Sequence, residues 1–373
     1  MSLQHRLTKP IRGSGLESVR RGRTAWIGWA VVLAVLALLV AWFAASRQAS
    51  IDAAFAAPVS VPDRLHTFTT IFLGIFIEAA PFLLAGTLAS GFVEVFVRPE
   101  ALARLIPRHP VLGALAGAAL GIVLPVCECG IVVVVRRLLA KGLPLRVGVA
   151  FLLAAPVVNP IVFASTLTAF GAGRMLLARF VLSFAFATLI ALLFGTARPD
   201  QVLREKPGHG NDHHHHHGHH HHHGHHHRED APTPESLARR VGAAIAAGAD
   251  DLFDVGRYLV AGSLLAAALQ ALVPQEAILA VGSGAVSSVL VLSVLAFVIS
   301  VCSTVDAFVA LSFVGTFTPA SILAFLVFGP MVDIKSCLMF ASIFRPRIVS
   351  YLIMLPLGAT LVVCLLLATQ IGF

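Results

Sequence analysis

Charged residues are scarce in this sequence. Asp, Glu, Lys and Arg make up only 12% of its 373 residues, whereas hydrophobic residues make up 57%. A soluble domain carries roughly 25% charged residues, and apolar runs of about 18 residues or more, the length of a membrane-spanning helix, recur along this chain. The sequence therefore predicts an all-α polytopic membrane protein in the lipid bilayer, and we do not expect an enzyme.

Other features are also missing. No Gly-x-x-x-x-Gly-Lys-Ser/Thr loop occurs, so ATP is not expected to drive this protein. The five cysteines are an odd number and lie in or beside apolar segments, which does not fit a secreted disulfide framework. No cleavable signal peptide is evident, because the first apolar segment is too long. The net charge of +8 does not indicate nucleic acid, because the basic residues fall in short loops, as in the positive-inside pattern.

These basic loops divide the chain into parts. We expect a basic cytoplasmic tail (1–24), an N-terminal transmembrane helix (25–45), a first repeat (65–195), a cytoplasmic His-rich linker (196–239) and a second repeat (240–370). Within the first repeat, residues 65–97, 147–171 and 175–195 are expected to cross the membrane. The location predicted is the cell inner membrane, with the N-terminus and the linker in the cytoplasm.

One apolar segment is interrupted at Cys127–Gly130. Pro125 removes a backbone donor and Gly130 frees the backbone, so a helix should break here. Broken backbone at membrane depth is tolerated where protein or water surrounds it, and a carboxylate such as Glu128 is costly there. The basic residues that follow favour a hairpin, which could be re-entrant or fully spanning. The alternative is a kinked helix with two cysteines that only pack.

The second half of the chain echoes the first. Glu78 and Asp254 are 176 positions apart, Cys127 and Cys302 are 175 apart, and Asn159 and Asp333 are 174 apart. Counting basic loops starts the first repeat outside and the second inside. We therefore expect two inverted-topology repeats with broken or re-entrant helices, and a site at the repeat interface near the midplane. The four expected breaks are Cys127–Gly130 and Pro156–Pro160 in the first half, and Cys302–Asp306 and Gly329–Lys335 in the second.

These motifs resemble a known family. Pro-x-Cys-x-Cys-Gly in the first half, with Cys-Ser-x-x-Asp-Ala-Phe and Gly-Pro-x-x-Asp-x-Lys in the second, is similar to the YraQ-type predicted permeases, which include ArsP-like exporters of trivalent organoarsenicals. The resemblance covers about 65–370 and implies a permease. Glu128 stands where a small residue is common in that family, which favours a cationic metal over a neutral organoarsenical.

The candidate substrate-binding residues are soft thiols and buried polar groups at the predicted breaks: Cys127, Glu128, Cys129, Asn159, Cys302, Asp306, Asp333 and Lys335. Glu78 and Asp254 are candidate proton relays. Simpler roles stay open for some of them. Asp333 and Lys335 could satisfy each other, Asn159 could replace backbone bonds lost at the adjacent prolines, and Asp254 could be interfacial.

A second candidate site is compositional. A histidine tract holds 14 of the chain's 17 histidines and should bind a transition-metal ion such as Zn, Cu, Ni or Co, with no cofactor required. Its members are His209, His213, His214, His215, His216, His217, His219, His220, His221, His222, His223, His225, His226 and His227. The alternative is a plain solvated linker.

Together these features predict an inner-membrane permease that exports a soft or transition-metal or metalloid species through a midplane Cys and acidic site. Its partners would be the bilayer and the substrate, and homo-oligomerisation stays open. A rival hypothesis is a transmembrane thiol–disulfide electron carrier that uses Cys127 and Cys302. A third is a metal sensor that moves nothing.

Overall fold

The computed structural model describes residues 61–107, 109–124, 126–195, 202–203, 237–272 and 284–371. The chain packs as two units, Met1–Ala57 and Pro58–Phe373, and all of these residues belong to the second unit. The predicted tail (1–24), the predicted N-terminal helix (25–45), Pro125 and the histidine tract (209–227) lie outside them. What was predicted of those segments therefore stays a prediction.

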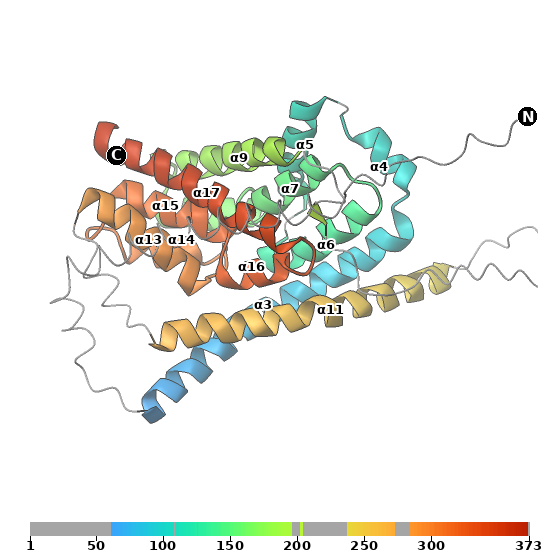
Figure 1. Ribbon diagram of the computed structural model, residues 1–373, viewed down its shortest axis with the longest axis horizontal. Coiled ribbons are helices and arrows are strands. Elements are labelled where there is room, and N and C mark those ends of the chain that lie inside the picture. The colour runs from blue at the N-terminus through green and yellow to red at the C-terminus, as the bar shows by residue number, and fades with distance from the viewer. Residues whose placement is uncertain are drawn as a thin grey trace, which may run out of the picture. The chain divides into compact units, whose positions relative to one another are not determined.

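The described residues are mainly helical and contain no strand (Figure 1). The elements are α3 (Val61–Phe96), α4 (Pro99–Leu105), α5 (Pro110–Val123), α6 (Glu128–Ala140), α7 (Leu145–Ala154), α8 (Pro160–Phe170), α9 (Arg174–Phe194), α11 (Leu237–Leu272), α13 (Ala285–Ile299), α14 (Asp306–Leu311), α15 (Pro319–Met331), α16 (Ile334–Phe340), α17 (Pro346–Leu366) and the π-helix η1 (Leu367–Ile371).

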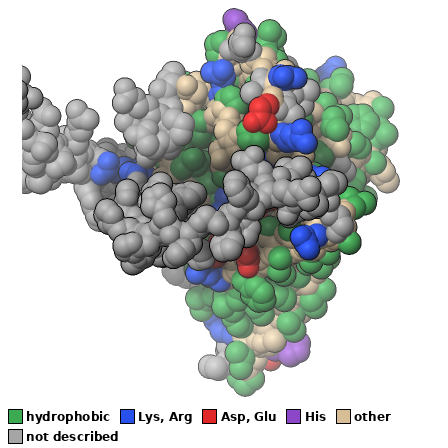
Figure 2. Space-filling model, turned by 90° about the vertical axis from the view of Figure 1, so that its right-hand side faces the viewer, with side chains coloured by type: hydrophobic (Ala, Val, Ile, Leu, Met, Phe, Trp, Pro, Cys, Tyr) green, Lys and Arg blue, Asp and Glu red, His purple; other side chains and the backbone are tan. Residues whose placement is uncertain are grey.

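Five helical stretches in this part of the chain are long and apolar enough to cross a membrane. They are Pro62–Phe96, Arg174–Phe194, Leu237–Leu272, Pro319–Phe340 and Pro346–Thr369. On the face drawn in Figure 2, hydrophobic side chains cover most of the described surface and charged ones form separate patches. A surface of this kind suits contact with lipid, so the prediction of a polytopic α-helical membrane protein holds.

The two longest helices, α3 and α11, contain 36 residues each, and their bounds are offset by 176 positions at both ends. They lie side by side in Figure 1 and run antiparallel, because Gly91 of α3 meets Ala244 while Thr87 meets Gly248. A Cβ atom at either glycine would collide with the facing backbone. Small residues therefore let the two backbones approach closely, as in other membrane helix pairs.

The structure contains all four predicted breaks. Chain interruptions separate α5 from α6, α7 from α8, α13 from α14, and α15 from α16. Within the expected crossing 147–171, the predicted break at 156–160 separates the short helices α7 and α8. The first break also lies earlier than expected: Cys129 and Gly130 belong to the first turn of α6, where Gly130 packs against Gly86 of α3.

Four helices that border the breaks lie inside the bundle. Almost every side chain of α7 and α15 is buried, and so are most of those of α6 and α16. The sequences of α7 and α15 are apolar on nearly every face, which is typical of helices enclosed on every side. The outer helices α9 and α17 instead expose large side chains such as Leu177, Leu189 and Val362. The breaks are therefore enclosed by protein, where interrupted backbone is tolerated at membrane depth.

Candidate functional site

A buried ion pair joins the starts of two helices that follow breaks. Glu128 is the first residue of α6 and Lys335 lies in the first turn of α16. The Lys335 ammonium lies 3.0 Å from Glu128 Oε1 and 3.4 Å from Asp333 Oδ2, and it donates to the Ser300 carbonyl at 2.9 Å. Glu128 is 4% exposed and Lys335 2%. Because isolated charges are costly in such surroundings, this pairing explains how both are accommodated.

Three thiols surround this ion pair. The Cys127 and Cys129 side chains contact each other at the start of α6, and Cys129 interacts electrostatically with Lys335. Cys302 lies in the break before α14; its thiol accepts from Thr304 Oγ1 at 3.5 Å and hydrogen-bonds the Glu78 carboxyl. All three cysteines are buried and free. The two halves of the chain thus bring their thiols to one buried charged centre.

Asn159 and Asp333 occupy equivalent positions as helix N-caps. Asn159 Oδ1 accepts from the backbone N–H groups of Ile161 and Val162, and its Nδ2 donates to the Ala155 carbonyl. Asp333 Oδ1 accepts from the Ser336 N–H at 2.6 Å, while its other oxygen faces Lys335. Asn159 therefore has the capping role that was one of its alternatives, whereas Asp333 both caps α16 and joins the charged centre.

A second buried ion pair lies near the first. Arg179 Nη2 of α9 lies 2.7 Å from Asp306 Oδ2, at the start of α14, and Arg179 Nη1 donates to Thr166 of α8. The Arg179 side chain is fully buried. Asp306 also interacts electrostatically with Glu128. The two ion pairs therefore lie in one charged region. This region connects α6, α8, α14 and α16, the four helices that begin after a break, to α9.

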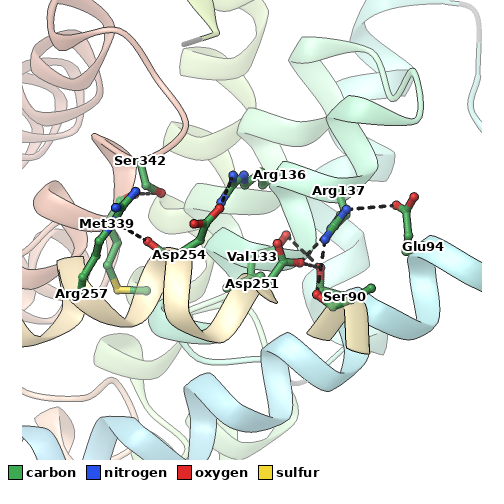
Figure 3. Close-up of polar contacts among 11 residues, drawn as sticks. Ser90, Glu94, Val133, Arg136, Arg137, Asp251, Asp254, Arg257, Met339 and Ser342 are labelled. Atoms are coloured by element: carbon green, nitrogen blue, oxygen red, sulfur yellow. Dashed lines mark hydrogen bonds and ion pairs between the residues drawn. The ribbon is translucent and has the colours of Figure 1, made fainter. Parts of the chain in front are cut away.

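Asp254 belongs to a different cluster, at the other end of α6 (Figure 3). Arg136 pairs with Asp254 at 3.0 Å, and Arg137 pairs with Asp251 at 2.8 Å and with Glu94 at 3.6 Å. The Asp254 side chain is 44% exposed. The structure thus separates the two proton-relay candidates: Glu78 lies beside the thiols, whereas Asp254 helps to hold α6 against α11.

The structure brings most of the predicted substrate residues together. Cys127, Glu128, Cys129, Cys302, Asp333 and Lys335 share the first charged centre, Asp306 lies beside it, and Asn159 acts as a cap. Sequence reasoning missed Arg179, although a single arginine inside an apolar span is itself a signal of function. Among the described residues, no group of three or more His, Cys, Asp or Glu side chains is placed to hold a metal ion.

The sequence is similar to known membrane proteins. Residues 64–369 match the ArsP_1 family, described as "Predicted permease". The chain is 42% identical over 301 residues to the UPF0718 protein YcgR of Bacillus subtilis, which covers 79% of this chain and 96% of that protein. It is 34% identical over 292 residues to a putative two-component membrane permease complex subunit of Streptococcus mutans, covering 78% and 91% respectively. No solved structure matches it.

The match spans nearly all of the described helices, from the start of α3 into η1. It includes both ion pairs, the three thiols and all four breaks. The family anticipated from the cysteine, aspartate and lysine motifs is thereby confirmed, and this chain belongs to the ArsP_1 family of predicted permeases.

Proposed function

We propose that this permease exports a soft metal or metalloid species through the centre formed by Cys127, Glu128, Cys129, Cys302 and Lys335. The observation that carries the proposal is the contact between the Cys127 and Cys129 thiols beside the buried Glu128–Lys335 pair. Thiolates are soft ligands that select Cu(I), Zn(II) or trivalent arsenic over hard ions. The Cys127 and Cys129 thiols, which lie at the start of one helix, can both bind such a species at the same time.

The geometry favours a site of low coordination number. A closed zinc site needs four ligands, and the described residues offer no preformed group of three. Cys127 and Cys129 provide two sulfur ligands, and the Cys302 thiol, which is engaged by Glu78 and Thr304, would be a third after a local shift. A weakly completed site suits a transporter, because a carried species must also leave.

Lys335 would control which charge enters the centre. Its ammonium already neutralises Glu128 and contacts Asp333, so an incoming cation would compete with it for the same carboxylates. A cationic metal would therefore displace Lys335 towards the Ser300 carbonyl, which already accepts its hydrogen bond. Release of the metal would let Lys335 return. In this proposal Lys335 acts as a counter-ion that neutralises the Glu128 and Asp333 carboxylates again after the metal has left.

The arrangement of α3 and α11 supports inverted repeats. These equivalent helices have the same length and run antiparallel, as the first helices of two inverted repeats must. In our proposal the repeats are residues 65–195 and 240–370. Rocking one repeat against the other would expose the thiol centre to each side of the membrane in turn.

The remaining parts of the proposal concern segments outside the described residues. We place the protein in the cell inner membrane with its N-terminus and histidine tract in the cytoplasm, where the tract would capture Zn, Cu, Ni or Co ions for the pathway. The name of the Streptococcus mutans relative is that of a complex subunit. A second subunit, or a second copy of this chain, is therefore a further proposed partner.

A resistance and accumulation panel tests the substrate. Cells with and without the protein are challenged with Zn, Cu, Ni, Co, arsenite and a methylated arsenical. We expect the protein to lower the accumulation of one soft species, and Cys127→Ser or Cys129→Ser to abolish that effect. Cys364→Ser, which alters a buried thiol in α17, is the matched control. Normal export by both Cys→Ser variants would show that the thiols only pack.

A further inference from the structure

Three buried oxygen atoms near the charged centre have no hydrogen-bond partner among the described residues. They are Glu128 Oε2, Ser303 Oγ and Asp306 Oδ1. Glu128 is 4% exposed, Ser303 1% and Asp306 2%. A buried oxygen that has lost its water and gained no partner costs about 1–3 kcal/mol. Three such atoms in one region therefore point to a ligand that binds oxygen.

The three oxygens come from two helix starts that lie close together. Ser303 and Asp306 belong to one turn before and at the start of α14, where the Asp306 N–H donates to the Cys302 carbonyl at 3.1 Å. Lys335 Nζ lies 3.0 Å from Glu128 Oε1 and 2.9 Å from the carbonyl of Ser300, which stands three residues before Ser303. The break between α13 and α14 therefore lies beside the carboxylate of Glu128.

The second oxygen of each carboxylate is already paired. Glu128 Oε1 binds Lys335 and Asp306 Oδ2 binds Arg179. Glu128 Oε2 and Asp306 Oδ1 are thus the second oxygen atoms of carboxylates that are already paired, and neither Lys335 nor Arg179 contacts them in a hydrogen bond. A cation would satisfy both of these oxygens at once.

Charge balance indicates a monovalent ion. Three buried carboxylates, those of Glu128, Asp306 and Asp333, face two buried cations, those of Lys335 and Arg179. With all three carboxylates ionised, one negative charge is left uncompensated, and the partly buried carboxyl of Glu78 interacts with the same group of charges. An uncompensated charge at membrane depth is costly, and a single monovalent cation would remove it.

We propose that Glu128 Oε2, Ser303 Oγ and Asp306 Oδ1 form a Na⁺ site, which supplies the coupling ion for export. Oxygen-only ligands suit hard cations, in contrast to the sulfur ligands of the neighbouring thiols. Transporters place such ions beside the ends of interrupted helices, and α13 ends at Ile299 just before Ser303. The coupling role rests on the proposed export function, whereas the ion site itself does not.

The purified full chain in detergent tests the site without any metal substrate. Binding of radioactive Na⁺ and thermal stability are measured in NaCl and in choline chloride at equal ionic strength. We expect saturable Na⁺ binding and a higher unfolding temperature in NaCl. Ser303→Ala, which removes one oxygen and no charge, should weaken binding by about tenfold or more. Asp306→Asn should do the same.

Thr360→Val is the matched control, because Thr360 in α17 is another buried hydroxyl without a partner among the described residues. It should bind Na⁺ as the unchanged protein does. Equal behaviour in NaCl and choline chloride, or unchanged binding by Ser303→Ala, would overturn the site. Export driven by a pH gradient in the absence of Na⁺ would overturn the coupling role. If the unchanged protein binds Na⁺ but shows no export that depends on the thiols, only the proposed function is refuted and the Na⁺ site stands.

Discussion

Gly262 of α11 lies directly against the backbone of Lys335: a Cβ atom at position 262 would sit 2.8 Å from Lys335 Cα. Its counterpart in the first half of the chain, Gly86 of α3, lies against Gly130 in the first turn of α6. These two glycines are 176 positions apart. Each long helix therefore presses a glycine against the helix start that carries one half of the Glu128–Lys335 pair.

Gly262→Ala should accordingly displace Lys335. The added methyl group meets backbone, which cannot turn aside as a flexible side chain would, so we expect a loss of stability of about 1–3 kcal/mol. Export should fall as well, because the Glu128–Lys335 geometry changes. Thermal unfolding and substrate accumulation measure the two effects. Gly242→Ala, on the same helix with open space around it, is the control and should be neutral or slightly stabilising.

The Glu128–Lys335 pair should show strong energetic coupling. Lys335→Met leaves the Glu128 and Asp333 carboxylates buried without their cation, and loss of one partner of a buried pair typically costs about 3–5 kcal/mol. The double change Glu128→Gln with Lys335→Met removes both charges and should cost less than Lys335→Met alone. A double-mutant cycle of thermal stability measures this coupling. Additive losses would mean that the pair does not interact in the folded protein.

Glu128→Gln also reports on the charge of the substrate. It keeps the shape of the side chain and removes its charge, so export of a cationic metal should fall sharply. Cys127→Ser and Cys129→Ser should be severe for any soft species, since even changes outside a metal's direct ligands typically cost 10–100-fold in affinity. Accumulation assays compare the three variants. Mild behaviour of Glu128→Gln together with severe Cys→Ser effects would identify a neutral substrate, such as a trivalent arsenical.

The orientation prediction can be tested at two positions outside the described residues. Reporter fusions at Asp230 and after Phe373 should report a cytoplasmic and an external location respectively. The basic residues beside the apolar segments are the physical reason. An external signal at Asp230 would overturn both the membrane orientation and the inverted-repeat argument.

Deletion of residues 209–227 should shift the metal dose response and leave some export. The tract lies outside both predicted repeats, so it can concentrate metal ions but does not line the pathway. Metal binding to the purified protein and resistance of cells measure the two roles separately. A substitution of the same residues by a Gly/Ser linker of equal length is the control for loop length. Complete loss of export in a normally inserted deletion variant would place the tract in the transport machinery.

Local patterns were enough to predict much of the helical framework. The expected spans 65–97 and 175–195 correspond to α3 and α9. Prolines and glycines, together with the echo between the two halves of the sequence, located the four breaks. The resemblance of the cysteine motifs also named the family correctly. These features depend on hydrophobicity and backbone chemistry within a few residues, which a sequence displays directly.

Partners across the fold could not be predicted in the same way. Pairing of Lys335 with its neighbour Asp333 was one of the alternatives left open, and the structure contains it, but the shorter contact of Lys335 is with Glu128 in the other half of the chain. Arg179 was overlooked, although it lies alone within an apolar span and pairs with Asp306. Such pairs depend on how the halves pack.

The length of α11 has a consequence for the depth of the centre. A 36-residue helix is about 54 Å long, whereas the hydrocarbon layer is about 30 Å thick. The charged residues of α11 all precede Tyr258, so in the proposed membrane arrangement this part of the helix lies at the level of the lipid headgroups and water, as does Arg136, which pairs with Asp254. With α6 along the membrane normal, Glu128 then lies eight residues, or about 12 Å, deeper than Arg136. In the proposed export pathway, a species bound at Glu128 has thus passed through most of one leaflet.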